Sequence, residues 1–340
     1  MDRTRTVTII CWAISALSFL GLIVWIFTSS VFNIGFGGLS GFGVSDGFGR
    51  FEPIATHSVP ADNIDSMRID WTSGAVIVRA HSGDSIQITE FAQRQVREDE
   101  QLSLSLDGGT LTIHFTQHRV LRTNMPSKQL EVLIPYALSE SFESFNVNTV
   151  SGRIDVSNVQ ANDFTAGTTS GRIELRGIAS PTINASTTSG RIEVFDTQAE
   201  EIHLRTTSGR IETTRTQAAK IYMRTTSGRI EAASTQAQSL STHTMSGRHE
   251  LSGAFGRVNT RSTSGRIEIT SSIVPEHLAA HATSGRISVT VPNEGPVSVQ
   301  YSTSSGRFTS TIPIITHAGA DAQFSLSTSS GRISLFEFTR

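Results

Sequence analysis

The sequence predicts an all-β protein: a single-chain β-solenoid with coils of about 19 residues, preceded by one N-terminal transmembrane helix. Three observations predict this fold class. Ser-Gly-Arg occurs ten times, apolar and polar residues alternate on both sides of each Ser-Gly pair, and an uncharged apolar run occupies residues 7–27. The repeat glycines are Gly152, Gly171, Gly190, Gly209, Gly228, Gly247, Gly265, Gly285, Gly306 and Gly331. A fixed period near 20 residues is typical of a solenoid, in which each coil buries its apolar face only against its neighbours.

The start of the chain is predicted to be a membrane anchor. Residues 7–27 carry no charge over 21 residues, which is long enough for a helix to span a bilayer, and we assign the transmembrane helix to residues 7–28. Arg3 and Arg5 precede this run, and no Lys or Arg follows it until Arg50. By the positive-inside rule, residues 1–6 form a cytoplasmic tail and the repeats lie outside the cell membrane.

A cleaved signal peptide is the alternative for the same segment. Its only candidate cleavage site is Thr28-Ser29-Ser30, and the apolar run is longer than a signal peptide needs. Cys11, the only cysteine, lies inside the run without the small-residue context of a lipoprotein cysteine. The sequence therefore predicts neither disulfides nor thiol chemistry.

Residues 29–58 are expected to be a tether, because glycine and phenylalanine alternate loosely from Val31 to Phe51. The phenylalanines leave two further roles open, which are anchoring at the outer membrane leaflet and packing on the first coil. Residues 59–340 are predicted to form the solenoid, with degenerate coils at 59–140 and regular Ser-Gly-Arg coils at 141–340. Gly74 and Gly109 mark the expected bends of the degenerate coils, where Ala75 and Thr110 replace the arginine.

The regular coils place equivalent residues in columns. In the coil around Gly209, Ile202, Leu204 and Thr206 before the bend and Ile211 after it have the parity of inward-facing residues. The arginine after each glycine forms one outward column. Two residues further on stand acids that are expected to offset the stacked positive charges, namely Asp155, Glu174, Glu193, Glu212, Glu231, Glu250 and Glu268.

The segment from Thr149 to Val156, with its Thr-x-Ser-Gly-x-Ile-x-Val pattern, resembles the bacterial putative-adhesin family of extracytoplasmic β-strand-repeat domains. The resemblance extends from about Val59 to the C-terminus and rests on the repeated Ser-Gly frame. It implies a β-helical fold, right-handed, and a location in the cell envelope. It implies no catalytic residues, because the family is defined by its domain and not by an activity.

Two sets of arginines are candidates for binding an anionic envelope polymer such as a teichoic acid or lipopolysaccharide. One outward column lies three positions before the repeat serine and reads Arg205, Arg224, His243, Arg261 and His281. Its arginines have no acidic partner within their strands. At the C-terminal end the acids of the repeat are replaced by Ser288, Thr309 and Ser334. The arginines left there without an acid are Arg286, Arg307 and Arg332. Elsewhere we interpret the arginine and acid columns as a structural ion ladder.

Other kinds of chemistry are less well supported by the sequence. His277 and His281 have the spacing of a helical metal pair but fall in a strand, so no metal or other cofactor is expected. Polysaccharide-cleaving enzymes would need convergent acids that interrupt the repeat, and the longest interruptions carry no paired carboxylates. Ice binding would need a wide outward threonine face, but only one of the two adjacent threonine rows can face outward.

The sequence thus predicts a membrane-anchored, extracytoplasmic β-solenoid that acts as a non-catalytic, adhesin-like interaction or structural module of the bacterial envelope. The alternatives are an accessory component of an envelope stress response and a self-assembling scaffold. The expected partners are the cell membrane, through residues 7–28, and either an anionic polymer or another membrane protein; self-association is a further option. A net charge of −2 argues against nucleic-acid binding.

Overall fold

The computed structural model describes residues 51–97, 100–115, 128–315 and 321–338, and these form an all-β unit. The cytoplasmic tail and transmembrane helix predicted for residues 1–28 lie outside the described residues. Within the described ranges, no helix has both the length and the apolar character needed to cross a membrane.

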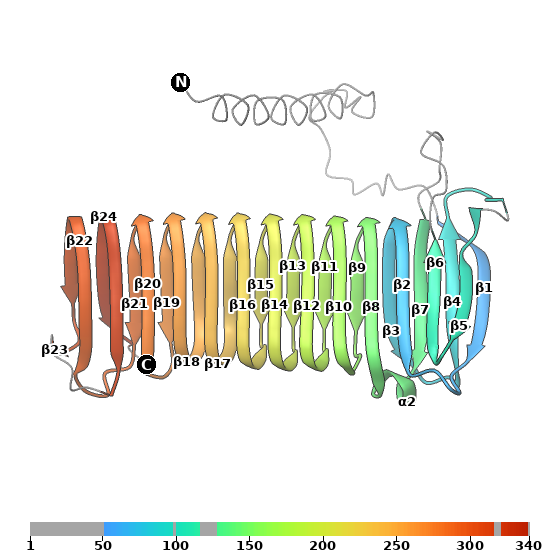
Figure 1. Ribbon diagram of the computed structural model, residues 1–340, viewed down its shortest axis with the longest axis horizontal. Helices are drawn as coiled ribbons and strands as arrows, with labels where there is room; N and C mark the ends of the chain where they lie inside the picture. The colour runs from blue at the N-terminus through green and yellow to red at the C-terminus, as the bar shows by residue number, and fades with distance from the viewer. Residues whose placement is uncertain (1–50, 98–99, 116–127, 316–320, 339–340) are drawn as a thin grey trace, which may run out of the picture. The chain divides into compact units, whose positions relative to one another are not determined.

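The elements form three groups along the chain (Figure 1). The first group is β1 (Glu52–Pro60), β2 (Ser66–Ser73), β3 (Ala75–His81), β4 (Ser85–Ala92), β5 (Ser103–Asp107), β6 (Thr110–Phe115), β7 (Lys128–Pro135) and the short helix α2 (Tyr136–Ser139). The regular array is β8 (Phe142–Ser151), β9 (Ile154–Ser157), β10 (Ala161–Ser170), β11 (Ile173–Arg176), β12 (Ala179–Ser189), β13 (Ile192–Phe195), β14 (Gln198–Ser208), β15 (Ile211–Thr214), β16 (Gln217–Ser227), β17 (Ile230–Ser246), β18 (His249–Ser264) and β19 (Ile267–Ser271). The last group is β20 (His277–Ser284), β21 (Ile287–Val291), β22 (Val297–Ser310), β23 (Ile314–Ile315) and β24 (Gln323–Glu337).

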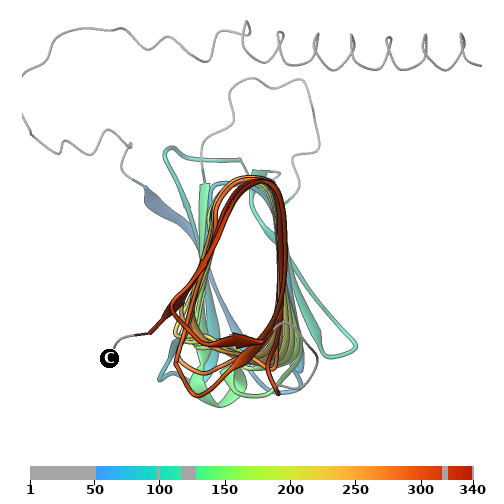
Figure 2. The same ribbon diagram turned by 90° about the vertical axis from the view of Figure 1, so that its left-hand side faces the viewer.

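Each regular coil is a long strand, a sharp bend at Ser-Gly-Arg, and a shorter strand that leads into the next coil. Like strands of neighbouring coils pair in parallel and in register, so that Ile202 lies beside Ile221 and Ile211 beside Ile230. Seen end-on, the coils superimpose as one tall closed loop that narrows towards the bend (Figure 2). The predicted β-solenoid is therefore confirmed for these residues.

The bend requires glycine because neighbouring backbones touch there. Gly209 has φ of +159°, and a Cβ atom added to it would lie 1.7 Å from the carbonyl oxygen of Gly190 in the preceding coil. The amide of Gly209 donates a hydrogen bond of 3.0 Å to the carbonyl of Ser227 in the next coil. The same overlap recurs at every repeat glycine from Gly152 to Gly331, which explains why the sequence preserves this residue.

The core is a set of stacked inward columns. The isoleucine after each bend is fully buried from Ile154 to Ile287, except where His249 takes its place. The inward threonines before the bend are also buried; Thr206, for example, is 2% exposed and donates to the carbonyl of Gly190. The hydroxyl therefore satisfies a stacked backbone carbonyl instead of facing solvent, and the single outward threonine row has the predicted parity.

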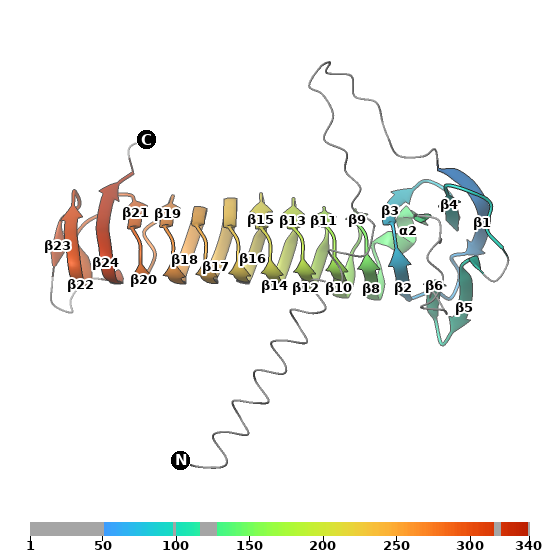
Figure 3. The same ribbon diagram turned by 90° about the horizontal axis from the view of Figure 1, so that it is seen from above.

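The coils at the N-terminal end do not stack in sequence order. The β2–β3 coil lies between β8–β9 on one side and β6–β7 on the other, so the chain builds an inner coil, then an outer one, and then returns (Figure 3). β5 and β4 pair antiparallel with β6 and β7, and β1 pairs antiparallel with β4. Antiparallel strands thus close this end.

Two sequence-based assignments at this end are wrong in detail. Gly109 is not the bend of a coil: Gly108 and Gly109, with φ of +53° and +81°, form the two-residue hairpin turn between β5 and β6. The predicted tether of residues 29–58 runs too far, because Glu52 to Pro60 form β1. Residues 29–50 of the tether lie outside the described residues.

The C-terminal end also departs from sequence order. β24, the last strand in the chain, pairs with β20 and β21 on one side and with β22 on the other. The final coil therefore lies between the β20–β21 coil and the β22 coil, which precedes it in the sequence (Figure 3). The outermost coil at this end is therefore the one built on β22.

Candidate functional site

The arginines after the bends form ion pairs with the acids two residues further on. The Arg153 guanidinium lies 2.7 Å from Asp155 and 2.8 Å from Glu174 of the next coil, and Arg172 pairs with Glu174 and Glu193. Pairs of the same kind continue as Arg191–Glu193, Arg210–Glu212, Arg210–Glu231, Arg229–Glu231, Arg248–Glu250 and Arg266–Glu268. This arrangement has the geometry of the structural ion ladder.

The first acids of the ladder are buried, which makes their arginine partners necessary. Asp155, Glu174 and Glu193 are 4%, 2% and 3% exposed. A carboxylate removed from water is stable only when paired, and loss of Arg172 would remove one partner from each of two buried acids, Glu174 and Glu193. These arginines consequently serve the fold.

Ten of the sixteen arginines from Arg153 to Arg332 form ion pairs, and six do not pair with any acid among the described residues. All six are exposed. They are Arg205, Arg224, Arg261, Arg286, Arg307 and Arg332, the residues singled out from the sequence as candidates for anion binding.

The structure divides these six between two surfaces. Arg205 and Arg224 are register partners on β14 and β16, and the column continues through His243 on β17, Arg261 on β18 and His281 on β20. We call these five residues the basic strip. Strand spacing places successive members about 4.8 Å apart.

The other surface lies beyond the bends at the C-terminal end. Arg307 pairs in register with Arg332, and the neighbouring match of Ile287 with Ile333 aligns Arg286 with Arg332. The spatial order is therefore Arg286, Arg332, Arg307, which differs from the sequence order because β24 is inserted. These three follow the bend, whereas the basic strip precedes it, so the structure does not bring the six together.

The arginines of the basic strip act on His243, the histidine that lies between two of them. Partial burial, together with the charges of Arg224 and Arg261 on either side, lowers the pKa of His243. A histidine held between two guanidinium groups resists protonation, because like charges at this spacing repel. An anion bound across the strip would relieve that repulsion.

Polar and aromatic side chains flank the strip on the same face. The rings of His203 and Tyr222 stack with centroids 4.7 Å apart, and together with Arg205, Arg224 and His243 they line a hollow of about 270 Å³. A second hollow of about 400 Å³ surrounds Arg261 and His281.

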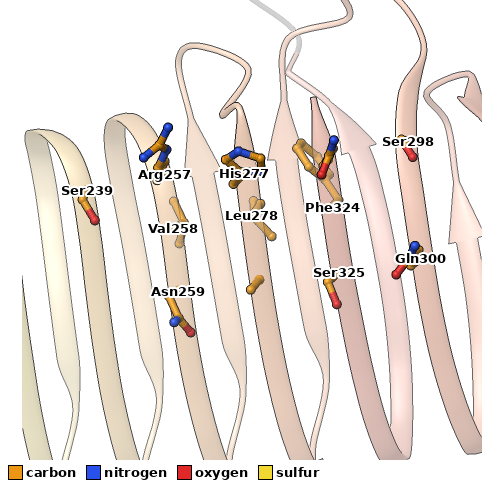
Figure 4. Close-up of a pocket in the computed structure, with 12 residues that line it drawn as sticks. Ser239, Arg257, Val258, Asn259, His277, Leu278, Ser298, Gln300, Phe324 and Ser325 are labelled. Atoms are coloured by element: carbon orange, nitrogen blue, oxygen red, sulfur yellow. The ribbon is translucent and has the colours of Figure 1, made fainter. Parts of the chain in front are cut away.

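A third hollow of about 440 Å³ adjoins the second, and Asn259, Ala279 and Ser325 line both. Figure 4 shows Arg257, His277 and Ser298 in one row across neighbouring strands, and Asn259, Ser325 and Gln300 in a second row. His203, Tyr222 and Arg257 were not predicted from the sequence. Reading the outward columns two and four residues before the strip would have found them, because they follow the same parity.

The described residues hold no group of three or more His, Cys, Asp or Glu side chains able to bind a metal ion. His277 and His281 both lie on β20, as the repeat predicted, and His281 contacts the hydroxyl of Ser327 at 2.6 Å. A buried charged pair lies at the N-terminal end, where the Lys128 ammonium is 2.6 Å from Glu90 and 3.6 Å from the Phe115 ring centroid. Burial lowers the pKa of Lys128 despite its pairing with Glu90. Lys128 and Glu90 thus form a buried ion pair with a structural role.

Several solved bacterial structures are similar to this chain. A putative adhesin from Bacteroides fragilis is 10% identical, with 84% of this chain and 96% of that chain covered and a TM-score of 0.38. A putative adhesin from Parabacteroides distasonis is 13% identical, with 85% and 98% covered and a TM-score of 0.38. A putative lipid binding protein from the same species is 12% identical, with 84% and 96% covered and a TM-score of 0.39.

No curated protein matches the chain. A family model described as Toastrack DUF4097 matches residues 64–254 and, in a second match, residues 196–336. Together the two matches span the solenoid from β2 to β24 and cover well over half of the sequence. The chain therefore belongs to the Toastrack DUF4097 family.

Proposed function

We propose that this protein is a membrane-anchored, non-catalytic, adhesin-like module whose basic strip binds an anionic polymer of the bacterial cell envelope. The main support for the proposal is the difference between two sets of arginines in the same repeat array. Ten arginines of the array are held in ion pairs, whereas Arg205, Arg224 and Arg261 are exposed, in register and unpaired among the described residues.

The spacing of the strip suits a polymer better than a single small anion. Guanidinium groups bind phosphate and carboxylate oxygens in bidentate fashion, and positions about 4.8 Å apart allow consecutive coils to engage one extended chain. Teichoic acids and lipopolysaccharide share phosphate chemistry, so either could supply the ligand. The stacked rings of His203 and Tyr222 offer an apolar surface for the sugar or polyol units between phosphates.

The binding test compares charge-matched variants of the purified full chain against teichoic acid and lipopolysaccharide in separate arms. Arg224→Gln with Arg261→Gln should weaken binding about a hundredfold or more, because each of the two lost charged contacts contributes about 1.5 kcal/mol or more. Binding should also fall steeply as salt is raised, since exposed charges are screened. The polymer that responds in both ways identifies the ligand source.

The control is Arg68→Gln with Arg215→Gln, which removes the same charge from two exposed ion pairs outside the strip. Arg153 and Arg172 are unsuitable, because their loss would weaken the pairing of buried carboxylates and so destabilise the fold. Arg286→Gln with Arg307→Gln measures the contribution of the second surface. Equal losses from the strip pair and the control pair, or binding insensitive to salt, would contradict the proposal.

The proposed orientation has a separate test. Residues 7–28 are apolar enough to span a bilayer, and Arg3 and Arg5 favour a cytoplasmic N-terminus. Protease added to intact cells or spheroplasts should therefore digest the chain beyond about Phe51 while an N-terminal tag stays protected. Recovery of an intact repeat region in the cytosolic fraction would refute this orientation.

A further inference from the structure

The solenoid ends in an open edge on its C-terminal side. β22 pairs along its length with β24, and on its other side only the two-residue strand β23 pairs with it among the described residues. Its residues from Gln300 to Ser302 are exposed, although the matching segment of β24 alternates with buried positions. The outer edge of β22 is therefore free to pair with another strand.

Two aromatic residues take inward positions in this last coil. Tyr301 is in register with the buried Leu326, and Phe308 with the buried Ile333. No further coil of the described residues lies above them, and the two rings stack face to face with centroids 4.1 Å apart and an interplanar angle of 7°. They cover the end of the core, yet Tyr301 remains 48% exposed.

The backbone of β22 also has donors that face outward. The amide of Ser298 donates to the carbonyl of Ala322, 3.0 Å away, on the side of β24. In a parallel pair successive amides point to alternate sides, so the amides of Val299 and Tyr301 face away from β24. An incoming strand could accept hydrogen bonds from both.

The edge strands at the two ends of the solenoid differ in the features that obstruct pairing with a further strand. At the N-terminal end β1 contains Pro53 and Pro60 and a register shift between Pro53 and Ala55, features that obstruct strand addition. β22 contains no proline over its 14 residues and carries one charge, Arg307. Only the C-terminal end lacks these obstacles.

We infer that the C-terminal end is a self-association surface, where β22 pairs antiparallel with β22 of a second copy across a two-fold axis. The axis must pass through the bend, because only then does each strand turn where its partner turns, and an axis between Ser305 and Gly306 meets this condition. It places the inward Phe308 opposite the inward Thr303, and Tyr301 opposite Ser310. It places Arg307 opposite Ser304, so the two arginines do not face one another. The same end thus supplies both the unpaired strand and its complement.

The test is sedimentation of the purified full chain over a range of concentrations, with variants at Ser304 and at Ser329, the equivalent position on β24 inside the stack. The wild-type chain should form a dimer whose dissociation constant rises about tenfold or more with Ser304→Lys, because the added ammonium would lie opposite Arg307 of the second copy. Ser329→Lys adds the same charge one coil away and should leave the constant unchanged.

Cross-linking tests the register. In a Cys11→Ser background, Ser305→Cys should give a disulfide-linked dimer under mild oxidation, because the axis passes beside this residue, and Ser330→Cys, at its register partner on β24, should not. A chain that stays monomeric at every concentration would overturn the inference. So would a dimer that survives Ser304→Lys and gives no Ser305→Cys cross-link, because its interface would lie elsewhere. Polymer binding by the basic strip does not enter either measurement.

Discussion

His249 is the residue that departs most sharply from its column. It stands between Ile230 and Ile267, is fully buried, and has Nδ1 3.0 Å from the hydroxyl of Thr242. Its Nε2 has no hydrogen-bond partner among the described residues. Burial, and secondarily the charge of His243, lowers the pKa of His249 to about 4. The sequence shows the substitution in the repeat, but not that the imidazole stays neutral in the core.

This residue makes stability depend on pH. The folded state holds His249 neutral down to about pH 4, whereas the unfolded chain binds a proton below about pH 6.5. Acid therefore favours the unfolded state, and stability falls by up to about 3 kcal/mol as pH drops from about 6.5 to about 4. His249→Ile should remove this part of the pH dependence. Thr242 would keep its bond to Thr260 in that variant.

Urea unfolding of both chains at pH 7.5 and pH 4.5 checks the prediction, since the difference between their stability losses isolates His249. Other histidines, including His243 with its lowered pKa, contribute equally to both chains. The same acid loss in wild type and variant would show that His249 is already protonated in the fold or is reached by water.

At the scale of the elements, the sequence repeat predicted the structural features that recur in every regular coil. The alternation around Gly209 gave the strands, their faces and their register, because one backbone geometry satisfies every coil. The unpaired state of Arg205, Arg224 and Arg261 also followed, since parity places no acid beside them. The spatial order of Arg286, Arg332 and Arg307 did not follow, because that depends on where β24 is inserted.

The ends were not predictable in the same way. A strand edge beside β20 accepts either β22 or β24, because both carry the Ser-Ser-Gly-Arg frame and similar alternation. The outcome depends on which coil better covers the core. Buried positions of β24 carry Phe324, Leu326 and Ile333, whereas the matching β22 positions include the half-exposed Tyr301. Long-range pairing of this kind leaves no local signal in the sequence.

For the whole solenoid, the free energy of unfolding should be approximately the sum of each coil's own stability and its interactions with the neighbouring coils. The reason is that each described regular coil contacts mainly the coils on either side of it. Ile211 tests this, because it is fully buried between Ile192 and Ile230 in the middle of the array. Ile211→Asp would bury a carboxylate without a partner and cost several kcal/mol, of the order of 3 or more.

We expect hydrogen exchange of Ile211→Asp to show the greatest loss of protection in β13, β15 and β17, less in β11 and β18, and the least in β8 and β24. Thr207→Asp is the matched control, because it adds the same charge to the same coil at an exposed position and should leave exchange near wild type. A uniform loss of protection from β8 to β24 would mean that the solenoid unfolds as one cooperative unit, and the neighbour-term description would then fail. A graded loss would mean that a weakened coil can open locally while the basic strip on its intact neighbours stays folded.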